Sequence, residues 1–169
     1  GSADAAAQSI ATVERVARDA LAEARALVAQ TAAVPAEPAF EEAVARLVER
    51  FRAEAGLVID LDGSPGVAQL DRETQVVLLR CLQEGLANVR KHAGATRVTV
   101  RVGTAGAAAV LVVSDDGRGF DVSRARSGFG LSGMADRAAL ADGELEVDSA
   151  PGRGTTLRVR LPIGEGSAA

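Results

Sequence analysis

The sequence predicts an α+β domain of about five strands and three helices, preceded by a long helix. In four segments, apolar residues recur at three- and four-residue spacing, which is typical of helices with one buried face. Five shorter segments are rich in valine and leucine or alternate apolar with polar residues, which is typical of strands. Glycine- and proline-containing breaks separate these segments, and the two kinds are interleaved. This mixture places the chain in the α+β class.

Length and composition are those of a folded domain. The 169 residues suffice for one domain with a real core plus an extra helix, and apolar residues make up 47% of them. The net charge is −4 with no basic stripe, which argues against nucleic acid as a partner. No apolar run approaches about 18 residues, so we expect no membrane contact by this segment and a cytoplasmic location. The sequence leaves open whether a longer parent protein is membrane-anchored.

The first predicted helix runs from Ser9 to Thr31, a stretch without glycine or proline. Its apolar positions alternate four and three apart, as in helices that pack along a partner helix; packing on its own domain is the alternative. Pro35 and Pro38 mark a linker. The expected units are residues 1–34 (the helix), residues 35–163 (the domain) and residues 164–169 (a loose tail).

The domain is expected to open with a helix and a short strand. The helix spans residues 39–54 and ends at Gly56. The strand spans residues 57–61, and the run Asp-Gly-Ser-Pro-Gly at residues 62–66 closes it as a turn.

A longer helix is predicted from Asp71, its N-cap, to Lys91, with Gly94 beyond its end. Its apolar residues form one face, and Glu84, Asn88 and Lys91, at positions i, i+4 and i+7, form a polar row on the opposite side. A carboxylate, a carboxamide oxygen and an ammonium in one row suit a hard cation and the phosphates that it bridges. A solvated polar face is the alternative.

The second half of the domain is predicted to contain four strands and one helix. Residues 96–102 alternate apolar with polar, which predicts one solvent-facing side, whereas residues 107–114 are almost continuously apolar and should be more buried. Residues 103–106 are expected to form the hairpin turn between these two strands. The remaining expected elements are a helix over residues 131–141 and strands over residues 144–148 and 155–161, joined by residues 149–154.

Asp115 directly follows the buried strand, and Gly117 and Gly119 come next. A carboxylate at the end of a buried strand can accept a hydrogen bond from an exocyclic amine, such as that of adenine. The two glycines would let a ligand ring approach the backbone. The alternative is an Asp-Gly hairpin turn, but residues 120–127 show no alternating pattern of a returning strand.

Glycines also precede the helix that begins near Leu131. Exposed amides at such a helix N-terminus bind phosphate, so Gly128 and Gly130 are candidate phosphate-binding residues. The segment also matches G-x-G-x-x-G, with Asp148 twenty residues beyond Gly128, as in dinucleotide-binding folds. That interpretation requires a strand immediately before Gly128, and no strand pattern stands there.

A few further residues have two interpretations each. Arg118, Arg124 and Arg126 could reach phosphates or be solvated, and Thr155 could bond a ligand or simply favour a strand. The single cysteine, Cys81, is expected in the core. The single histidine, His92, is expected to interact with the last carbonyls of its helix.

Taken in order, these motifs closely resemble the ATP-binding domain of sensor histidine kinases, over about residues 40–162. The matching motifs are Glu84-x-x-x-Asn88-x-x-Lys91-His92-Ala93, Asp115-x-Gly117-x-Gly119-Phe120, Gly128-x-Gly130-Leu131 and Gly154-Thr155 before a strand that ends Leu161-Pro162. The subfamily that looks similar is that of the nitrate/nitrite sensors and the desaturase-regulating thermosensor, in a superfamily with gyrase B and MutL. The resemblance implies a two-layer α+β sandwich of the Bergerat type that binds ATP between helices and sheet.

The resemblance also implies roles for the matching residues. At the phosphate end, Asn88 would ligate Mg²⁺, Glu84 would lie beside the metal and polarise water or the acceptor, and Lys91 would contact phosphate. At the base end, Asp115 would hold the adenine amino group with Thr155 joining through water, and two glycines, Gly117 and Gly119, would leave room for the base. Gly128 and Gly130 would bind phosphates, and Leu131 would be a further nucleotide contact. Residues 120–127 would be a short ATP lid.

The N-terminal helix resembles the second helix of the family's dimerisation and phosphotransfer hairpin. The first hairpin helix, with the phosphoacceptor histidine, is absent from the sequence, so we expect ATP binding without self-phosphorylation. The implied partners are that histidine helix of the parent kinase, which would be a homodimer, and a response regulator. Alternatives are an anti-sigma serine kinase of the same fold and a non-catalytic nucleotide-gated interaction module.

Overall fold

The computed structural model describes residues 39–63, 67–123 and 129–163, which belong to one compact unit, Pro38–Ala169. Three expectations fall outside the described residues: the helix from Ser9 to Thr31, the proline linker, and the tail over residues 164–169. In the described part of the chain, no helix is long and apolar enough to cross a membrane.

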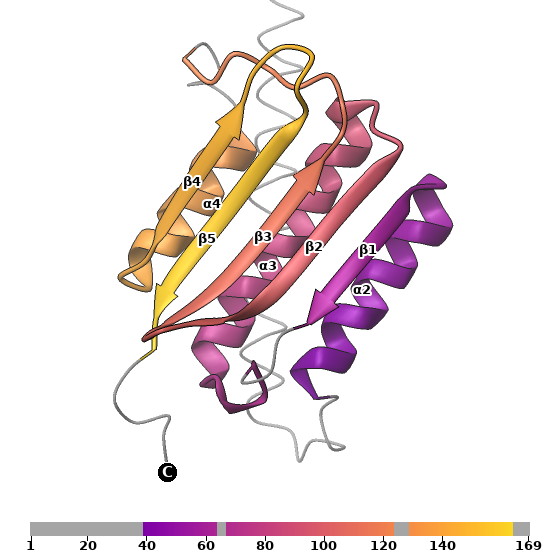
Figure 1. The fold of residues 1–169 in the computed structure, drawn as a ribbon. Coiled ribbons are helices and arrows are strands. Elements are labelled where there is room, and N and C mark those ends of the chain that lie inside the picture. Colours follow the sequence, from indigo (N-terminus) through magenta and orange to yellow (C-terminus); the bar gives the residue numbers. More distant parts are fainter. Residues whose placement is uncertain (1–38, 64–66, 124–128, 164–169) are drawn as a thin grey trace, which may run out of the picture. The chain divides into compact units, whose positions relative to one another are not determined.

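A five-stranded mixed sheet forms one layer of the domain (Figure 1). Its strands lie in the order β1-β2-β3-β5-β4; β1 and β2 are parallel, and the other neighbouring pairs are antiparallel. The strands are β1 (Val58–Gly63), β2 (Arg97–Ala105), β3 (Ala108–Asp115), β4 (Glu144–Ser149) and β5 (Thr155–Pro162).

Helices cover one face of this sheet, and no described segment covers the other (Figure 1). The α-helices among the described residues are α2 (Phe40–Ala55), α3 (Arg72–Asn88) and α4 (Phe129–Leu140). A short 3₁₀ segment, η1 (Val67–Gln69), precedes α3, and a π turn, η2 (Val89–Ala93), follows it. The predicted α+β two-layer sandwich is therefore confirmed.

Single residues next to the helices determine where α3 begins and where α2 and η2 end, as the sequence predicts. Asp71 caps α3 by accepting hydrogen bonds from the amide of Thr74 at 2.9 Å and from its hydroxyl at 2.7 Å. The Thr74 amide bond is the main reason that the pKa of Asp71 is lowered. Gly56 and Gly94 end their helices with positive φ angles of 64° and 59°, which glycine adopts without strain.

The core lies between the helix layer and the inner face of the sheet. One face of α3 is buried there through Leu78, Leu82 and Leu86, each at most 1% exposed. Cys81 is buried on the same helix, as predicted, and its desolvation raises the pKa of the thiol to about 11.

One expectation about the central hairpin is corrected. Gly103 and Thr104 continue β2, so the turn lies at Gly106 and Ala107 and not at residues 103–106. Pairing extends because Ala105 lies opposite Ala108, and Gly106 takes the positive φ of 60°. The expectation that β3 is more buried than β2 is confirmed, since β3 alternates buried with partly exposed residues, whereas β2 also has exposed ones. The outward residues of β3 stay partly exposed because no described segment covers that face.

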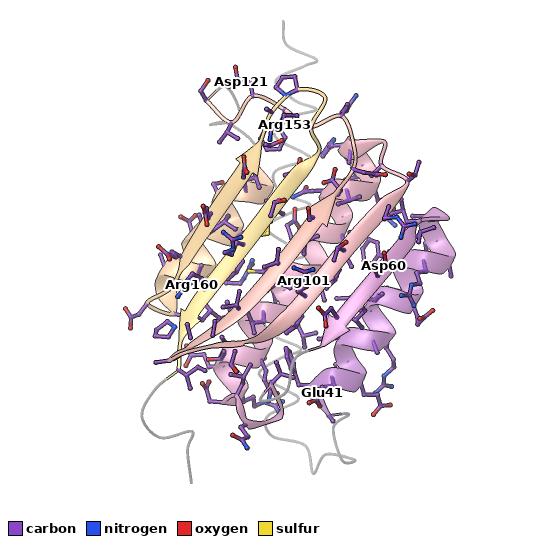
Figure 2. All side chains as sticks on the ribbon, viewed as in Figure 1. Glu41, Asp60, Arg101, Asp121, Arg153 and Arg160 are labelled. Atoms are coloured by element: carbon purple, nitrogen blue, oxygen red, sulfur yellow. The ribbon has the colours of Figure 1, made fainter. Side chains whose placement is uncertain are left out.

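The outer face is polar at its edges (Figure 2). Arginines of β2 and β5 point outward and pair with acids of the edge strands β1 and β4. These ion pairs are Arg97–Asp60, Arg101–Asp62, Arg158–Glu146 and Arg160–Glu144. All of these side chains are at least 43% exposed, so each pair contributes little to stability.

Candidate functional site

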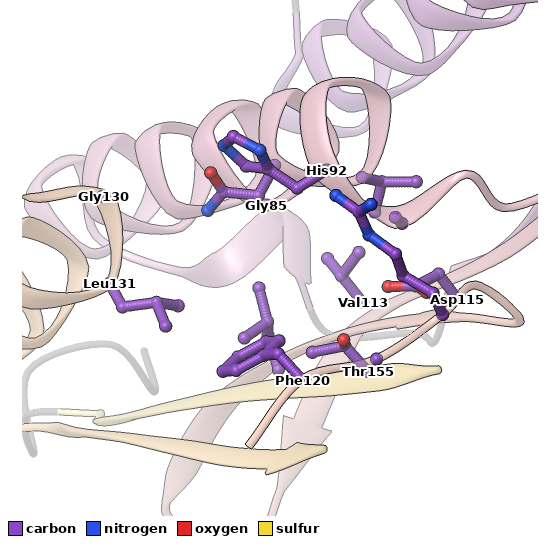
Figure 3. A pocket seen from close by; sticks show the side chains of 14 residues that line it. Gly85, His92, Val113, Asp115, Phe120, Gly130, Leu131 and Thr155 are labelled. Carbon is purple, nitrogen blue, oxygen red and sulfur yellow. The ribbon is translucent and has the colours of Figure 1, made fainter. Parts of the chain in front are cut away.

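A cavity of about 400 Å³ lies between α3, the start of α4 and the end of the sheet's inner face (Figure 3). Its size and largely apolar lining suit a small organic ligand with a few polar groups. The lining residues are Gly85, Asn88, Val89, His92, Ala93, Val113, Asp115, Arg118, Gly119, Phe120, Gly130, Leu131, Thr155 and Leu157.

The floor of the cavity is where the inner face of the sheet changes from apolar to polar. Val113 and Leu157 are register partners on this face, and both line the cavity. The next row of register partners lies where β3 and β4 end and β5 begins, and it consists of Asp115, Ser149 and Thr155, respectively. We call these three residues the inner row. Side chains two residues apart on a strand share a face, so this row continues the buried apolar rows into the cavity.

Asp115 is held in the inner row by backbone amides. The amide of Gly117 donates to Oδ1 of Asp115 at 2.8 Å. Burial raises the pKa of Asp115 above its usual value, although hydrogen bonds from the amides of Gly117 and Thr155 oppose this effect; the neighbouring charge of Asp116 also raises it. A partly buried carboxylate at the wall of a cavity is a strong acceptor for a ligand N–H group.

Asp116, the next residue, serves the fold and not the cavity. Its carboxylate accepts the amides of Thr96 and Arg97 at 2.8 and 2.9 Å and the hydroxyl of Thr96 at 2.8 Å. These bonds, that of the Arg97 amide first, lower its pKa. Of the two consecutive aspartates, only Asp115 lines the cavity.

Gly117 and Gly119 are required by contacts within the chain itself. A Cβ on Gly117 would lie 2.5 Å from the carbonyl oxygen of Ala93, and one on Gly119 would overlap the carbonyl oxygen of Ala150. Gly119 also has a positive φ of 58°. Gly119 lines the cavity and Gly117 does not. The close approach of these glycines therefore has a reason independent of any ligand ring.

Glu84 and Asn88 come together at the start of α4. A Cβ on Gly130 would lie 2.6 Å from Oε1 of Glu84 and 3.4 Å from both terminal atoms of the Asn88 side chain. The backbone of α4 thus lies directly against both side chains. Gly130 and Leu131 line the cavity opposite Asp115 (Figure 3). Gly128, the other predicted phosphate-binding glycine, lies outside the described residues.

The π turn changes which side chain follows Asn88 into the cavity. The sequence predicts Lys91 on the face of Glu84 and Asn88, which assumes α-helical geometry up to Lys91. The π turn begins at Val89, and its wider turn moves later residues around the axis. His92 therefore lines the cavity, and Lys91 is exposed and is not among the lining residues. A contact of Lys91 with phosphate stays a prediction.

Among the residues that were not predicted as site residues, two line the cavity with ring side chains, His92 and Phe120, and one, Ser149, lies next to it. His92 stands in the matched motif, but it lies outside the predicted polar row, because nothing in the sequence indicates a π turn. Phe120 belongs to the matched motif, and its ring lies beside the cavity (Figure 3). Ser149 could have been found by extending the alternation of Leu145 and Val147, since all three share the inner face.

The structure bears on only some of the alternatives left open for the three arginines and for the dinucleotide-binding motif. Arg118 lines the cavity, and its amide donates to the carbonyl of Ala93 at 2.8 Å. Arg124 and Arg126 lie outside the described residues. Residues 116–123 contain no strand, so within the described chain the strand required before a dinucleotide-binding glycine motif is not found.

Comparison with known proteins identifies the domain. The family model "Histidine kinase-, DNA gyrase B-, and HSP90-like ATPase" matches residues 73–165. The sensor histidine kinase LiaS of Bacillus subtilis is 33% identical over 162 residues, which are 95% of this chain and 44% of LiaS. The histidine-protein kinase/phosphatase DegS of Brevibacillus brevis is 32% identical over 119 residues, 70% of this chain and 31% of DegS. The chain thus spans less than half the length of these relatives.

Solved structures agree on the fold. The histidine kinase domain of the blue-light activated kinase of Erythrobacter litoralis superposes with a TM-score of 0.63 at 19% identity, covering 80% of this chain and 68% of that one. The mycobacterial sensor histidine kinase MprB gives a TM-score of 0.57 at 25% identity, covering 73% of this chain and 93% of that one. The chain therefore belongs to the family of histidine kinase-, DNA gyrase B- and HSP90-like ATPases, as an ATP-binding catalytic domain of the histidine kinase type.

Proposed function

We propose that this chain is the part of a sensor histidine kinase that binds Mg-ATP and supplies its γ-phosphoryl group to a histidine elsewhere in the parent protein. The observation that carries the proposal is the polarity of the cavity. A partly buried acceptor, Asp115, lies at one end, and the start of α4 with Asn88 lies at the other (Figure 3). These ends suit a base and a phosphate chain, respectively.

Asp115 is the residue that would recognise adenine. Its carboxylate can accept the exocyclic amino group, and Thr155 lies beside it as its register partner. We propose that Thr155 joins this contact through a water molecule. Gly119 and Val113 leave an apolar space for the ring between them and α3.

The residues near the start of α4 fit a magnesium ion. Asn88 and Glu84 supply oxygens next to Gly130. No group of three or more His, Cys, Asp or Glu that could hold a metal occurs among residues 39–63, 67–123 and 129–163. This agrees with Mg²⁺, which typically takes one or two protein oxygens and completes its shell with phosphate and water. When bound, Mg²⁺ neutralises charge on the phosphates.

Other residues would complete the phosphate end. Asn88 would hold the metal, and Glu84 would polarise water or the acceptor histidine. Gly128, Gly130 and Leu131 would hold phosphates with the amides at the start of α4, where the helix dipole favours negative charge. Lys91 would reach them from the exposed side of η2.

The parent protein is proposed to be a homodimer that relays the phosphoryl group to a response-regulator aspartate. Residues 1–34 would be the second helix of its dimerisation hairpin, and residues 35–163 the catalytic domain. Relatives that are named sensor histidine kinases, LiaS among them, support this assignment over an anti-sigma serine kinase. Phosphoserine on an added anti-anti-sigma protein would instead support that alternative.

The test is calorimetric titration with a non-hydrolysable ATP analogue, with and without Mg²⁺. We expect Mg²⁺-dependent binding, and Asn88→Ala should remove the dependence on Mg²⁺ while adenine recognition remains. Gln83→Ala, an exposed change on the same helix, is the matched control. Binding that ignores Mg²⁺ in the wild type would favour a non-catalytic interaction module, and no binding would refute the proposal.

A further inference from the structure

Ser149 is the most heavily bonded side chain beside the cavity, and the proposed function above gives it no role. Its Oγ accepts the amide of Phe120 at 3.0 Å. It donates to the carbonyl of Gly154 at 2.9 Å. It also lies 3.1 Å from Oγ1 of Thr155, its register partner in the inner row. One hydroxyl thus connects three separate positions around the site.

The donors and acceptors in this cluster determine where the Thr155 proton lies. A serine hydroxyl has one hydrogen and two lone pairs. The Gly154 carbonyl can only accept, so it takes the Ser149 hydrogen. The Phe120 amide can only donate, so it takes one lone pair. The remaining bond, between Ser149 and Thr155, must therefore use the hydrogen of the Thr155 hydroxyl.

This assignment leaves Thr155 with lone pairs alone toward the cavity. Asp115, on its other side in the inner row, is also an acceptor when ionised. The floor of the cavity then offers acceptors from two adjacent side chains. Such a floor matches a ligand group that donates. A water molecule between Asp115 and Thr155 would give both its hydrogens to these two acceptors and offer the base only lone pairs, so a carbonyl at the same place would find no hydrogen to accept.

We propose that Ser149 is a positioning residue for base selection: by binding the Thr155 hydroxyl hydrogen, it keeps Thr155 an acceptor and so favours a 6-aminopurine over a 6-oxopurine nucleotide. This inference rests on the proposed function, since it takes the inner row as the base-recognition site. It adds a selectivity determinant that does not itself contact the base.

The test is calorimetric binding of ADP and IDP with Mg²⁺, whose bases differ in carrying a 6-amino or a 6-oxo group and, with it, a bare or a protonated N1. Ser149→Ala frees the Thr155 hydroxyl to donate to the bridging water, which can then donate to a 6-oxo group. We expect the preference for ADP over IDP to fall roughly 3–10-fold, the effect of about one hydrogen bond. A loss of equal size for both nucleotides, with the preference unchanged, would overturn the proposal, since a purely structural role predicts that result.

A double-mutant comparison isolates the mechanism. In the Thr155→Val background there is no hydroxyl to orient, so adding Ser149→Ala should leave the preference unchanged; a further change there would overturn the proposal. Ser114→Ala is the matched control, because Ser114 and Thr156 form an equivalent hydroxyl pair at 2.9 Å on the outer face. It should not alter the preference.

Two further outcomes are covered. If Ser149→Ala does not fold by circular dichroism, Ser149→Thr and Ser149→Val, which have the same shape, replace it; only the valine variant should lose preference. Wild-type protein that binds neither nucleotide would refute the proposed function together with this inference. Wild-type binding with equal preference in both variants would refute this inference alone.

Discussion

The two faces of the sheet carry nearly the same residue types where β3 and β4 end and β5 begins. The inner row is Asp115, Thr155 and Ser149. The preceding or following residues form an outer row, Ser114, Thr156 and Asp148, with the same kind of register. Each row has a carboxylate, a threonine and a serine, and a hydroxyl pair at about the same distance, 3.1 Å inside and 2.9 Å outside.

The rows differ in what covers them. The inner row adjoins a cavity lined by residues of α3, α4 and the 118–120 segment, whereas the outer row lies on the face that no described segment covers (Figure 1). A ligand hydrogen bond that replaces one to water on an exposed face contributes little to the free energy of binding, whereas one made in a partly dry cavity contributes more. The comparison teaches that residue types alone do not make a site; the helix layer does.

The largest effect should come from disturbing the backbone that supports the inner row. A Cβ on Gly154 would overlap the carbonyl oxygen of Asp115, and Gly154 has a φ of 69°. We expect Gly154→Ala to lower the free energy of unfolding by roughly 3–5 kcal/mol, measured by urea denaturation. Gly152→Ala, at a φ of 80° but in open space, should cost only about 1–2 kcal/mol. Equal costs would show that the close approach is unimportant.

The next effect concerns ligand recognition. Asp115→Asn should weaken ATP binding by about 1.5–3 kcal/mol, roughly 10–100-fold, because a charge-assisted hydrogen bond is lost. GTP should be affected less, since guanine offers a carbonyl at that position. Asp148→Asn, the same change in the outer row, should leave ATP affinity unchanged. Calorimetry on the wild type and the two variants measures these affinities. Equal losses of affinity for ATP and GTP in Asp115→Asn would show that the assignment of Asp115 to the base is wrong.

A third prediction uses opposite pKa shifts in Asp115 and Asp116, whose usual value is 3.8. The raised pKa of Asp115 means that its contribution to stability is present below pH 3.8 and is lost as pH rises through the folded-state pKa. The lowered pKa of Asp116 means that its contribution is present above pH 3.8 and is lost as pH falls through the folded-state pKa.

Melting temperatures across acidic to neutral pH should therefore separate the two aspartates. Relative to wild type, Asp115→Asn should gain stability as the pH rises from 3.8 through the folded-state pKa of Asp115. Asp116→Asn should lose stability relative to wild type as the pH rises from the folded-state pKa of Asp116 to 3.8. The same sign for both variants would contradict the division of roles between site and fold.

The smallest effect is expected on the outer face. Arg158 pairs with Glu146 at 2.8 Å, but the two side chains are 43% and 63% exposed. Arg158→Ala should cost about 0.2–1 kcal/mol of stability and should not change nucleotide affinity. A cost well above this range in urea denaturation would indicate that the outer face is covered by another segment or partner.

Features fixed by neighbours in the sequence were predictable. Asp71 begins its helix, and Gly56 and Gly94 end theirs, where expected, because capping depends on residues within one turn. Asp115 could be placed in the site because it directly follows a strongly apolar strand. The valine alternation of β2 also predicted its buried face correctly.

Features fixed by distant contacts were not predictable. Gly103 and Gly106 are equally good turn residues, and only the pairing of β2 with β3 selects Gly106. His92 lines the cavity in place of Lys91 because of a π turn, which the helical pattern in the sequence does not indicate. The bonds of Ser149 reach Phe120, 29 residues away, through strand register.

The burial of Cys81 has a practical consequence. With a pKa of about 11, its thiol is ionised in only about one molecule in ten thousand at pH 7, and alkylating probes react with thiolates. The sequence contains no other cysteine. A cysteine introduced at an exposed position such as Val122 would therefore accept a fluorophore or spin label selectively, in an otherwise native background, and would report on nucleotide-dependent motion beside the site.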